Sequence, residues 1–306
     1  MNKPIAISAE TLIKSFKGTK ALNEINLEVI EGEIYGLIGP DGAGKTTLIR
    51  ILCSLLFPDS GEVKVLGLNP VQDMKALRRK IGYMPGRFSL YHDLSVEENL
   101  NLFARLFETS IKENYHLIRD IYQQIEPFKK RKAGALSGGM KQKLALSCAM
   151  IHRPDILFLD EPTTGVDPVS RKEFWEMLGK LNRNGLTILV STPYMDEAAQ
   201  CSRISLIQKG QFMATGTPAE IINSGSEKYY SIKGDNKYDL LKATRNFKTC
   251  QSVYAFGSSL HYTDQKVEFE PSELGRFLNE KGFGDVEIEA IEPGIEDRFM
   301  TLMKNG

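Results

Sequence analysis

The fold is decided by the stretch Ile34-Tyr35-Gly36-Leu37-Ile38-Gly39-Pro40-Asp41-Gly42-Ala43-Gly44-Lys45-Thr46. Its first five residues are a run without polar alternation, which is typical of a strand buried on both faces of a parallel sheet. The rest matches the P-loop pattern G-x-x-x-x-G-K-[ST]. The stretch Thr46 to Leu56 then predicts a helix. A buried strand, a glycine-rich loop and a helix in this order predict a site for nucleotide phosphates.

The chemistry of this loop follows from its residue types. Glycines let backbone N–H groups curl around phosphate oxygens, because no Cβ stands in the way. The helix that follows adds partial positive charge at its amino end. Lys45 can reach the β- and γ-phosphates, and the Thr46 hydroxyl can bind Mg²⁺. The alternative, a glycine-rich turn without a ligand, is disfavoured because both flanking elements are correct. The predicted nucleotide-binding residues are Gly39, Pro40, Asp41, Gly42, Ala43, Gly44, Lys45, Thr46 and Thr47.

A second motif ends another apolar run, Ile156-Leu157-Phe158-Leu159-Asp160-Glu161, and has the form of a Walker B strand. Asp160 at the carboxyl end of the strand suits a Mg²⁺ ligand acting through water. Glu161, one residue further, can polarise the water that attacks the γ-phosphate, and it is the predicted catalytic residue. The alternative is an acidic turn after a core strand. The P-loop upstream favours the catalytic interpretation.

A third motif, Leu136-Ser137-Gly138-Gly139-Met140-Lys141-Gln142, lies between the other two. Its paired glycines expose backbone N–H groups at the start of a helix predicted from Lys141 to Ile151. This arrangement predicts a second phosphate-binding nest, far in sequence from the first.

The remaining pattern predicts an α/β P-loop fold, with a mainly parallel sheet, an antiparallel β-layer within residues 5–35 and a helical subdomain at about 88–150. The stretch 88–133 is expected to be helical throughout, with Ser95 and Glu98 as a capping box. Composition changes at 223–226, which predicts a linker. The predicted domains are therefore 1–223 and a small C-terminal α+β domain, 224–306, whose β-α-β-β-α-β order resembles a ferredoxin-like module.

Composition narrows the function classes. The chain has 306 residues, is 42% hydrophobic and 25% charged, and has a formal net charge of zero. A zero balance argues against nucleic acid as a partner, since such proteins usually carry basic excess. The four cysteines are scattered without metal-ligand or redox spacing, which is typical of reduced thiols in a cytosolic protein. Neither a signal peptide nor an apolar run long enough to span a bilayer is expected, so any membrane function requires a separate membrane partner.

In this order the three motifs make the chain resemble the nucleotide-binding subunits of ABC transporters, over roughly residues 3–223. In that family two cassettes pair head to tail, and each ATP lies between one P-loop and the partner's signature. The resemblance implies ATP and Mg²⁺ as cofactors, and a second cassette and integral membrane permease subunits as partners. It also implies a cytoplasmic location, peripheral on the inner face of the cell membrane. The signature residues are Leu136, Ser137, Gly138, Gly139 and Met140.

Further landmarks match the family. Gly165-Val166-Asp167-Pro168 looks like the D-loop, with Asp167 at the dimer interface. Phe16 stands where the family places an adenine-stacking aromatic, and the alternative is a core residue of the β-layer. Tyr91 to Leu100 looks like the segment that couples to membrane domains, and the alternative is a capped surface helix. The tail Pro293 to Phe299 is similar to the tails of drug- and antibiotic-export cassettes.

Two positions depart from the family pattern. Gly86 stands where a glutamine follows Met84-Pro85, and Pro193 stands where a histidine follows Ser191-Thr192. Glycine has no side chain for Mg²⁺ or the attacking water, and proline cannot hydrogen-bond a γ-phosphate. His92 and His152 lie elsewhere in the motif order, so neither is expected to substitute.

The sequence therefore predicts the ATP-binding subunit of an ABC transporter, an ATPase that drives export of a drug-like or apolar molecule through separate membrane subunits. Its own ATP site is impaired by Gly86 and Pro193. Two alternatives stay open, a regulatory subunit that binds ATP with little turnover and a soluble ABC ATPase outside transport. The transported substrate and the choice between homodimer and heterodimer are not determined by the sequence.

Overall fold

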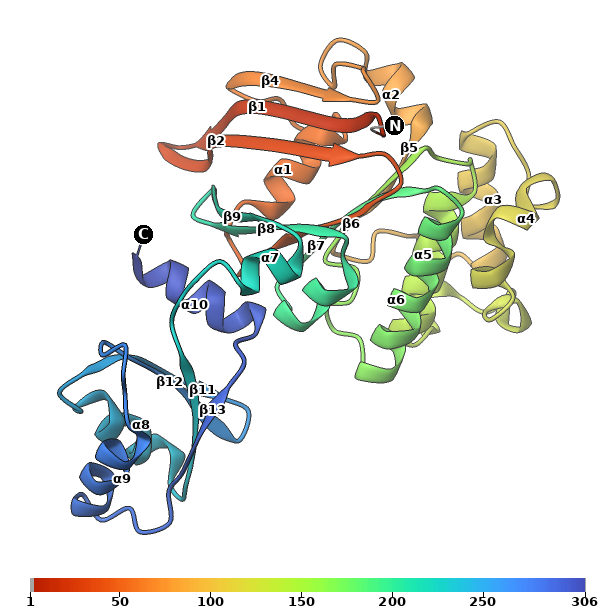
Figure 1. Cartoon of the computed structure of the whole chain (residues 1–306). Helices are drawn as coiled ribbons and strands as arrows, with labels where there is room; N and C mark the ends of the chain where they lie inside the picture. Colours follow the sequence, from red (N-terminus) through yellow and green to blue (C-terminus); the bar gives the residue numbers. More distant parts are fainter. Residues whose placement is uncertain (1–2, 306) are drawn as a thin grey trace. The chain divides into compact units, whose positions relative to one another are not determined.

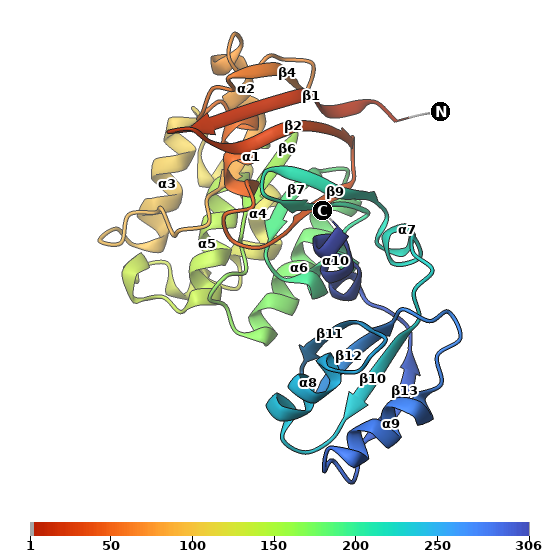
Figure 2. The ribbon, with the colours of Figure 1, turned by 90° about the vertical axis from the view of Figure 1, so that its left-hand side faces the viewer.

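The computed structural model of the chain describes residues 3–305, and the fold divides into two compact units, 1–218 and 219–306. The ribbon is shown in two views (Figures 1 and 2). Within residues 3–305, no helix has both the length and the apolar character needed to cross a membrane. Each unit has its own sheet and its own core.

The first unit is built on a sheet with the strand order β5-β6-β7-β3-β8-β9, parallel except for the antiparallel edge strand β9. Every residue of β3, β6 and β7 is buried, as expected for apolar strands covered on both faces. The strands are β3 Ile34–Ile38, β5 Ile81–Met84, β6 Ile156–Asp160, β7 Thr187–Thr192, β8 Arg203–Gln208 and β9 Gln211–Gly216.

An antiparallel β-layer covers one side of this sheet, and helix α1 (Lys45–Leu52) lies between the two (Figures 1 and 2). The layer has the order β2-β1-β4 and alternates buried with exposed residues. Apolar side chains of the layer, such as Leu12 and Leu22, share one core with Leu48 of α1 and Phe158 of β6. The strands are β1 Ile5–Phe16, β2 Thr19–Ile30 and β4 Ser60–Val65.

Helices fill the rest of the first unit, and in Figure 1 α5 and α6 run side by side. The N-cap of α5 is Ser137, whose hydroxyl accepts a hydrogen bond from the Met140 amide. The helix therefore begins at Gly138, three residues before the predicted start at Lys141. The helices are α2 Met74–Lys80, α3 Val96–Leu106, α4 Ile111–Tyr122, α5 Gly138–Met150 and α6 Pro168–Arg183, with 3-10 turns at Glu126–Phe128, Ala133–Ala135 and Met195–Gln200. Helix α7, Pro218–Ile222, begins at the last residue of the first unit and otherwise belongs to the second.

The prediction that residues 88–133 are helical throughout was wrong. Residues 88–95 form a turn-rich loop that ends at the capping box of Ser95 and Glu98, which was predicted. The buried side chain of Asn99 holds this loop, because it bonds the backbone N–H and C=O of Tyr91. Glu108, in the left-handed region with φ 60°, then separates α3 from α4.

The helix predicted from Thr46 to Leu56 is also shorter than expected. It ends at Leu52, and Ser54 follows with φ 59°, a conformation that stops a right-handed helix. The apolar residues beyond it leave the core, since Leu55 and Phe57 are about half exposed, at 50% and 51%. The apolar run from Ile51 to Phe57 therefore covers two environments, the end of a buried helix and an exposed loop.

The second unit has an antiparallel sheet of order β11-β12-β10-β13, and helices α8 and α9 pack on one face of it. This order, with its β-α-β-β-α-β sequence of elements, is that of a ferredoxin-like module. Residues such as Ile232, Leu260 and Leu274 form its core. The elements are β10 Tyr229–Lys233, α8 Lys237–Arg245, β11 Cys250–Phe256, β12 Ser259–Asp264, α9 Pro271–Glu280, β13 Glu287–Ile291 and α10 Ile295–Asn305.

Polar contacts hold α10 to the second unit. Buried Asp297 accepts a hydrogen bond from the Gly294 amide at 2.8 Å and lies 2.7 Å from Nδ1 of His261 on β12. Buried Arg298 donates to the backbone oxygen of Ile222 at 2.9 Å and to Glu227 at 2.6 Å. The second bond lowers the pKa of Glu227 below its ordinary value. The tail that resembles export cassettes therefore fastens α10 to β12 and to the segment that precedes β10.

Replacing Asp297 by alanine should loosen α10. The change removes two hydrogen bonds to a buried carboxylate, each of a kind that contributes roughly 1.5–3 kcal/mol. Hydrogen exchange followed by mass spectrometry should show amides of α10 and β12 exchanging about tenfold faster or more. Glu292→Ala, at an exposed site just before the helix, is the matched control. Unchanged exchange in Asp297→Ala would contradict the proposed anchor.

Candidate nucleotide-binding site

The P-loop connects the carboxyl end of β3 to α1, and its backbone geometry requires glycine at two positions. Gly44 caps α1 with φ 111°, and a Cβ there would stand 2.5 Å from the Ala21 carbonyl oxygen. A Cβ on Gly39 would stand 2.2 Å from the carbonyl oxygen of Ile207. Both distances are shorter than any real contact, so neighbouring backbone segments define the path of the loop.

Lys45 points back into the loop. Its side chain is 3% exposed, and Nζ donates to the carbonyl oxygens of Gly39 at 2.8 Å and Pro40 at 3.0 Å. The same Nζ lies 3.1 Å from Oε1 of Glu161. The structure therefore brings the predicted phosphate-binding cation and the predicted catalytic carboxylate into direct contact.

Asp160 forms the polar centre beneath them. Its Oδ1 accepts hydrogen bonds from the hydroxyls of Thr46, at 3.0 Å, and Ser191, at 2.7 Å. Among the described residues, no cluster of three or more His, Cys, Asp or Glu side chains could hold a metal ion. A hydroxyl beside a carboxylate nevertheless fits Mg²⁺, which prefers oxygen ligands and usually keeps waters and substrate phosphates in its shell.

Glu161 adopts a strained backbone conformation, with φ 51°. Its amide is shared between the hydroxyl of Ser191, at 3.0 Å, and the carbonyl oxygen of the same residue, at 3.1 Å. The side chain is 21% exposed and borders a cavity of about 330 Å³ beside the P-loop. The residues that line this cavity are Ala21, Asp41, Gly42, Gly44, Lys45, Thr46, Thr47 and Glu161.

The signature lies apart from this cavity, against the first turn of α6. A Cβ on Gly139 would approach the Ser170 hydroxyl to 2.8 Å, and one on Gly138 would approach the Gly165 carbonyl oxygen to 3.5 Å. Asp167 caps α6 by accepting a hydrogen bond from the Ser170 amide at 3.0 Å. This hydrogen bond holds the pKa of Asp167 below its ordinary value. Signature and D-loop are therefore neighbours within one chain.

Phe16 ends β1, and its ring is on the surface. The residue is 46% exposed, so the alternative that it belongs to the core is wrong. The ammonium of Lys14 lies 5.5 Å from the ring centroid. Phe16 does not line the P-loop cavity, whereas Ala21 of the neighbouring strand β2 does.

The two departures from the family pattern lie close to the site. A Cβ on Gly86 would stand 2.9 Å from the Asp160 carbonyl oxygen and 3.6 Å from Cβ of Glu161. The backbone of the loop after β5 therefore packs so closely on the end of β6 that a side chain at position 86 has no room to begin. Pro193 directly follows β7, and the carbonyl of the preceding Thr192 accepts a hydrogen bond from the Gly39 amide at 3.3 Å.

Neither histidine noted in the sequence lines the P-loop cavity. His152 stacks on Phe107 with ring centroids 3.7 Å apart, and burial lowers its pKa. His92 lies edge-on against Phe88 at 5.1 Å. Ser191, by contrast, was not predicted as a site residue. Its contact with Asp160 depends on the β6–β7 register, which places these two residues opposite each other.

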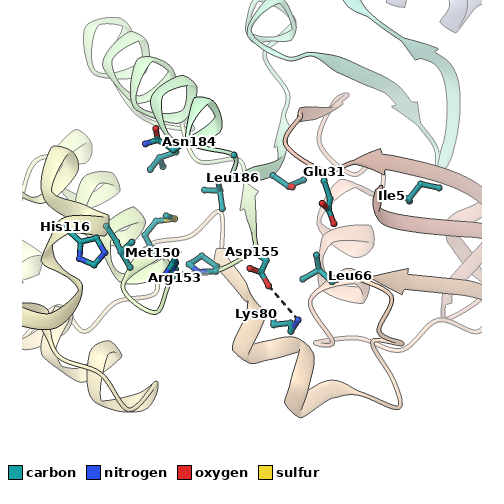
Figure 3. A pocket seen from close by; sticks show the side chains of 15 residues that line it. Ile5, Glu31, Leu66, Lys80, His116, Met150, Arg153, Asp155, Asn184 and Leu186 are labelled. Carbon is teal, nitrogen blue, oxygen red and sulfur yellow. Dashed lines mark ion pairs between the residues drawn. The ribbon is translucent and has the colours of Figure 1, made fainter. Parts of the chain in front are cut away.

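A second cavity, of about 760 Å³, lies away from these motifs (Figure 3). It opens at the amino ends of the parallel strands, beside the residues that precede β5, β6 and β7. Lys80 and Asp155 form an exposed ion pair there at 3.9 Å. It is larger than the P-loop cavity but contains none of the predicted site residues. The chemistry, and not the volume, identifies the nucleotide site.

Known proteins are similar to this chain in sequence and in fold. The sequence profile of the family described as ABC transporter matches residues 22–164. The chain is 37% identical to a probable multidrug ABC transporter ATP-binding protein, YbhF, of Escherichia coli (strain K12), over 97% of this chain and 52% of that protein. It thus spans about half the length of that relative.

Other relatives match along nearly their whole length. Identity is 34% to the Nod factor export ATP-binding protein I of Rhizobium sp. (strain N33), over 97% of both chains. It is 36% to the daunorubicin resistance ATP-binding protein DrrA3 of Streptomyces coeruleorubidus, over 97% of this chain and 95% of that protein.

Solved structures agree with the fold. One is described as a dimeric, post-hydrolysis state of the ATP-binding cassette MJ0796 with ADP and Pi. It aligns with a TM-score of 0.63 and 27% identity, over 69% of this chain and 98% of that one. With the P-loop, the Asp160–Glu161 strand and the signature assembled on this fold, the chain belongs to the family of ABC transporter ATP-binding proteins.

Proposed function

We propose that the chain binds and hydrolyses ATP as the cytoplasmic motor subunit of an ABC exporter whose membrane subunits are separate proteins. The observation that supports this most is the meeting of Lys45, Thr46, Asp160 and Glu161 around one cavity. The names of the relatives support a drug-like or otherwise apolar cargo. The protein would then lie on the inner face of the cell membrane, held there by its membrane subunits.

The proposed reaction is in-line transfer of the γ-phosphoryl group to water. Backbone N–H groups of the P-loop and the ammonium of Lys45 would hold the β- and γ-phosphates. Thr46 and Asp160 would hold Mg²⁺, which would neutralise phosphate charge. Glu161 would orient the attacking water and take its proton, while the bond between the γ-phosphorus and the bridging oxygen breaks and ADP leaves.

A second cassette would complete the site. The signature nest from Leu136 to Met140 lies away from this chain's P-loop cavity, so its amides are positioned for a phosphate held by another chain. Asp167 would lie at the interface between the cassettes, and Phe16, exposed at the end of β1, would stack on adenine.

The membrane partner would bind apolar side chains exposed on the first unit. Tyr91, at 59% exposure, begins the segment that resembles the coupling surface, and Leu106 of α3 is 71% exposed. Leu55 and Phe57, in the loop after α1, are about half exposed. These exposed apolar side chains are the candidates for contact with a membrane subunit.

Gly86 and Pro193 favour a second function for this chain's own site, namely binding ATP with little turnover. Both remove a side chain that could position the water or the γ-phosphate. Phosphoryl transfer depends chiefly on positioning and electrostatics, and losing one preorganised group commonly costs about 10²–10³ in rate. The signature is intact, so the composite site built on the partner's P-loop can be fully active.

Lys45→Ala should abolish tight Mg-ATP binding, because the loop loses its charge-assisted contact with the phosphates. Isothermal calorimetry on the purified chain measures this directly. Lys75→Ala, which removes an exposed cation on α2, should bind ATP like the wild type. An unchanged ATP affinity in Lys45→Ala would refute the nucleotide site.

Ser191→Ala should weaken magnesium-dependent ATP binding by roughly tenfold, as expected when the hydrogen-bond partner of a metal-binding carboxylate is lost. The Ser191 hydroxyl both donates to Asp160 and accepts from the Glu161 amide. Ser205→Ala is the matched control, since this buried serine bonds Tyr35 and Thr215 instead. Equal affinities of the two variants, titrated with Mg-ATP, would show that Ser191 does not position Asp160.

The two ATP sites of the working dimer should be unequal. In the assembled transporter, Ser137→Arg should abolish turnover, because it blocks the signature that serves the partner's intact site. Glu161→Gln should reduce turnover far less, because it alters a site already impaired by Gly86 and Pro193. The measurement is steady-state ATPase activity of both variants. Equal loss in the two would contradict the asymmetry, and so would brisk turnover by a homodimer of this chain.

A further inference from the structure

The first turn of α6 carries a cation that joins two functional segments. Arg171 Nε donates to Oε1 of Glu197 at 3.2 Å, and its Nη2 lies 3.0 Å from Oδ2 of Asp196. Its guanidinium also stacks over the ring of Tyr194, 4.1 Å from the centroid. Glu197 is only 3% exposed, so its charge depends on Arg171 for compensation. These partners all follow Pro193, which stands where the family pattern has a histidine.

The same segment is hydrogen-bonded to the P-loop. The Gly39 amide donates to the carbonyl oxygen of Thr192 at 3.3 Å, and the Tyr194 amide donates to the hydroxyl of Thr192 at 3.0 Å. Pro193 lies between these two bonds and has no amide of its own. Thr192 therefore links the P-loop backbone to Tyr194 through hydrogen bonds.

On its other side the first turn of α6 touches the signature. Ser170 precedes Arg171, and its hydroxyl lies where a Cβ on Gly139 would approach to 2.8 Å. One helical turn further, Glu173 pairs with Lys143 of α5 at 2.8 Å. Contacts this close leave α6 little freedom to move without moving the signature.

We propose that Arg171 is a positioning residue that transmits nucleotide occupancy of this chain's P-loop to its signature, through Thr192, Tyr194 and the Asp196–Glu197 pair. The inference rests on the proposed nucleotide binding. The proposal gives this chain's own ATP site a role even without turnover. ATP bound there would set the geometry of the signature that binds the partner's ATP. A chain of contacts becomes a coupling only when nucleotide binding at the P-loop is seen to change α6, the helix that packs against the signature.

The fluorescence of a single tryptophan can be used to follow changes near Arg171. Trp175, the single tryptophan, follows Arg171 by about one turn of α6 and is 7% exposed. It lines a cavity of about 470 Å³ together with Arg171, Asp196 and Glu197. Its indole Nε1 has no hydrogen-bond partner among the described residues. Indole emission depends on the surroundings of the ring, so a rearrangement of the charged residues that line this cavity should change it.

The test titrates the whole chain with Mg-ATP and follows Trp175 emission, with calorimetry on the same samples. Wild-type protein should show an emission change that saturates with the calorimetric binding curve. Arg171→Ala should bind ATP within about twofold of wild type but lose at least about half of the emission change. Arg171→Lys should be intermediate, because lysine keeps the charge without the planar fork. Lys180→Ala, at an exposed cation in the last turn of α6 that does not line this cavity, should respond like wild type.

Arg171→Ala leaves Glu197 buried without a counter-charge, so a second variant guards against misfolding. Arg171→Met/Glu197→Leu removes the pair together, which proteins often tolerate well. It should fold, bind ATP and show the same loss of response. A full emission change in this variant or in Arg171→Ala would overturn the proposal, as would a wild-type chain that binds ATP with no change in emission. Absence of calorimetric binding by wild type would instead overturn the nucleotide site itself, and this inference with it.

Discussion

The arrangement of the site depends on one buried cation. The ammonium of Lys45 is withdrawn from solvent, and a charge in that position requires acceptors on every side. The carbonyls of Gly39 and Pro40 provide two, and the carboxylate of Glu161 provides the third. The carbonyls can converge only because the loop turns tightly. The carboxylate can converge only because β6 ends at this level of the sheet. Compensation of a single charge thus fixes the distance between the phosphate loop and the proposed catalytic residue.

The backbone at Glu161 shows how the sheet supports this geometry. A left-handed conformation of a non-glycine residue costs about 1–3 kcal/mol and persists only where its surroundings determine it. Here the β6–β7 register does so, because it sets Asp160 opposite Ser191. The Ser191 hydroxyl then accepts a hydrogen bond from the Glu161 amide and donates one to the Asp160 carboxylate. One serine therefore orients two acidic residues that are adjacent in sequence but point in different directions.

The sequence predicted those features that follow from local pattern. Continuous apolar runs identified β3 and β6, and the glycine spacing identified the loop between β3 and α1, because both signals are local to the residues that form these elements. The loop before α3 could not be predicted in this way, since a single buried Asn99 holds it through contacts that interrupt an apparent helical period. The early end of α1 was hidden because Leu55 is apolar and yet exposed.

Tertiary register explains the other omissions. Ser191 is ordinary in sequence, and only strand pairing brings it to Asp160. Arg171 is one of several charged residues on α6, and only the fold sets it against Glu197. The C-terminal Asp297 and Arg298 lie in a tail that the sequence marked by similarity alone, whereas their hydrogen bonds give that tail a structural task in the second unit.

The two departures from the family pattern differ physically. At position 86 the space for a side chain is already occupied, because a Cβ would press on the Asp160 carbonyl oxygen at 2.9 Å. Glycine is therefore part of how this loop packs against β6, and a larger residue would displace the strand end that carries Asp160. At position 193 proline removes a donor and restricts the backbone, but Thr192 and Tyr194 keep their hydrogen bonds on either side of it. With glycine at position 86, the loop after β5 packs directly against the end of β6. Proline at position 193 leaves no side chain that could donate a hydrogen bond to a phosphate, while the hydrogen bonds from Gly39 to Thr192 and from Tyr194 to Thr192 are present. Together they suit a site whose occupancy matters more than its own turnover.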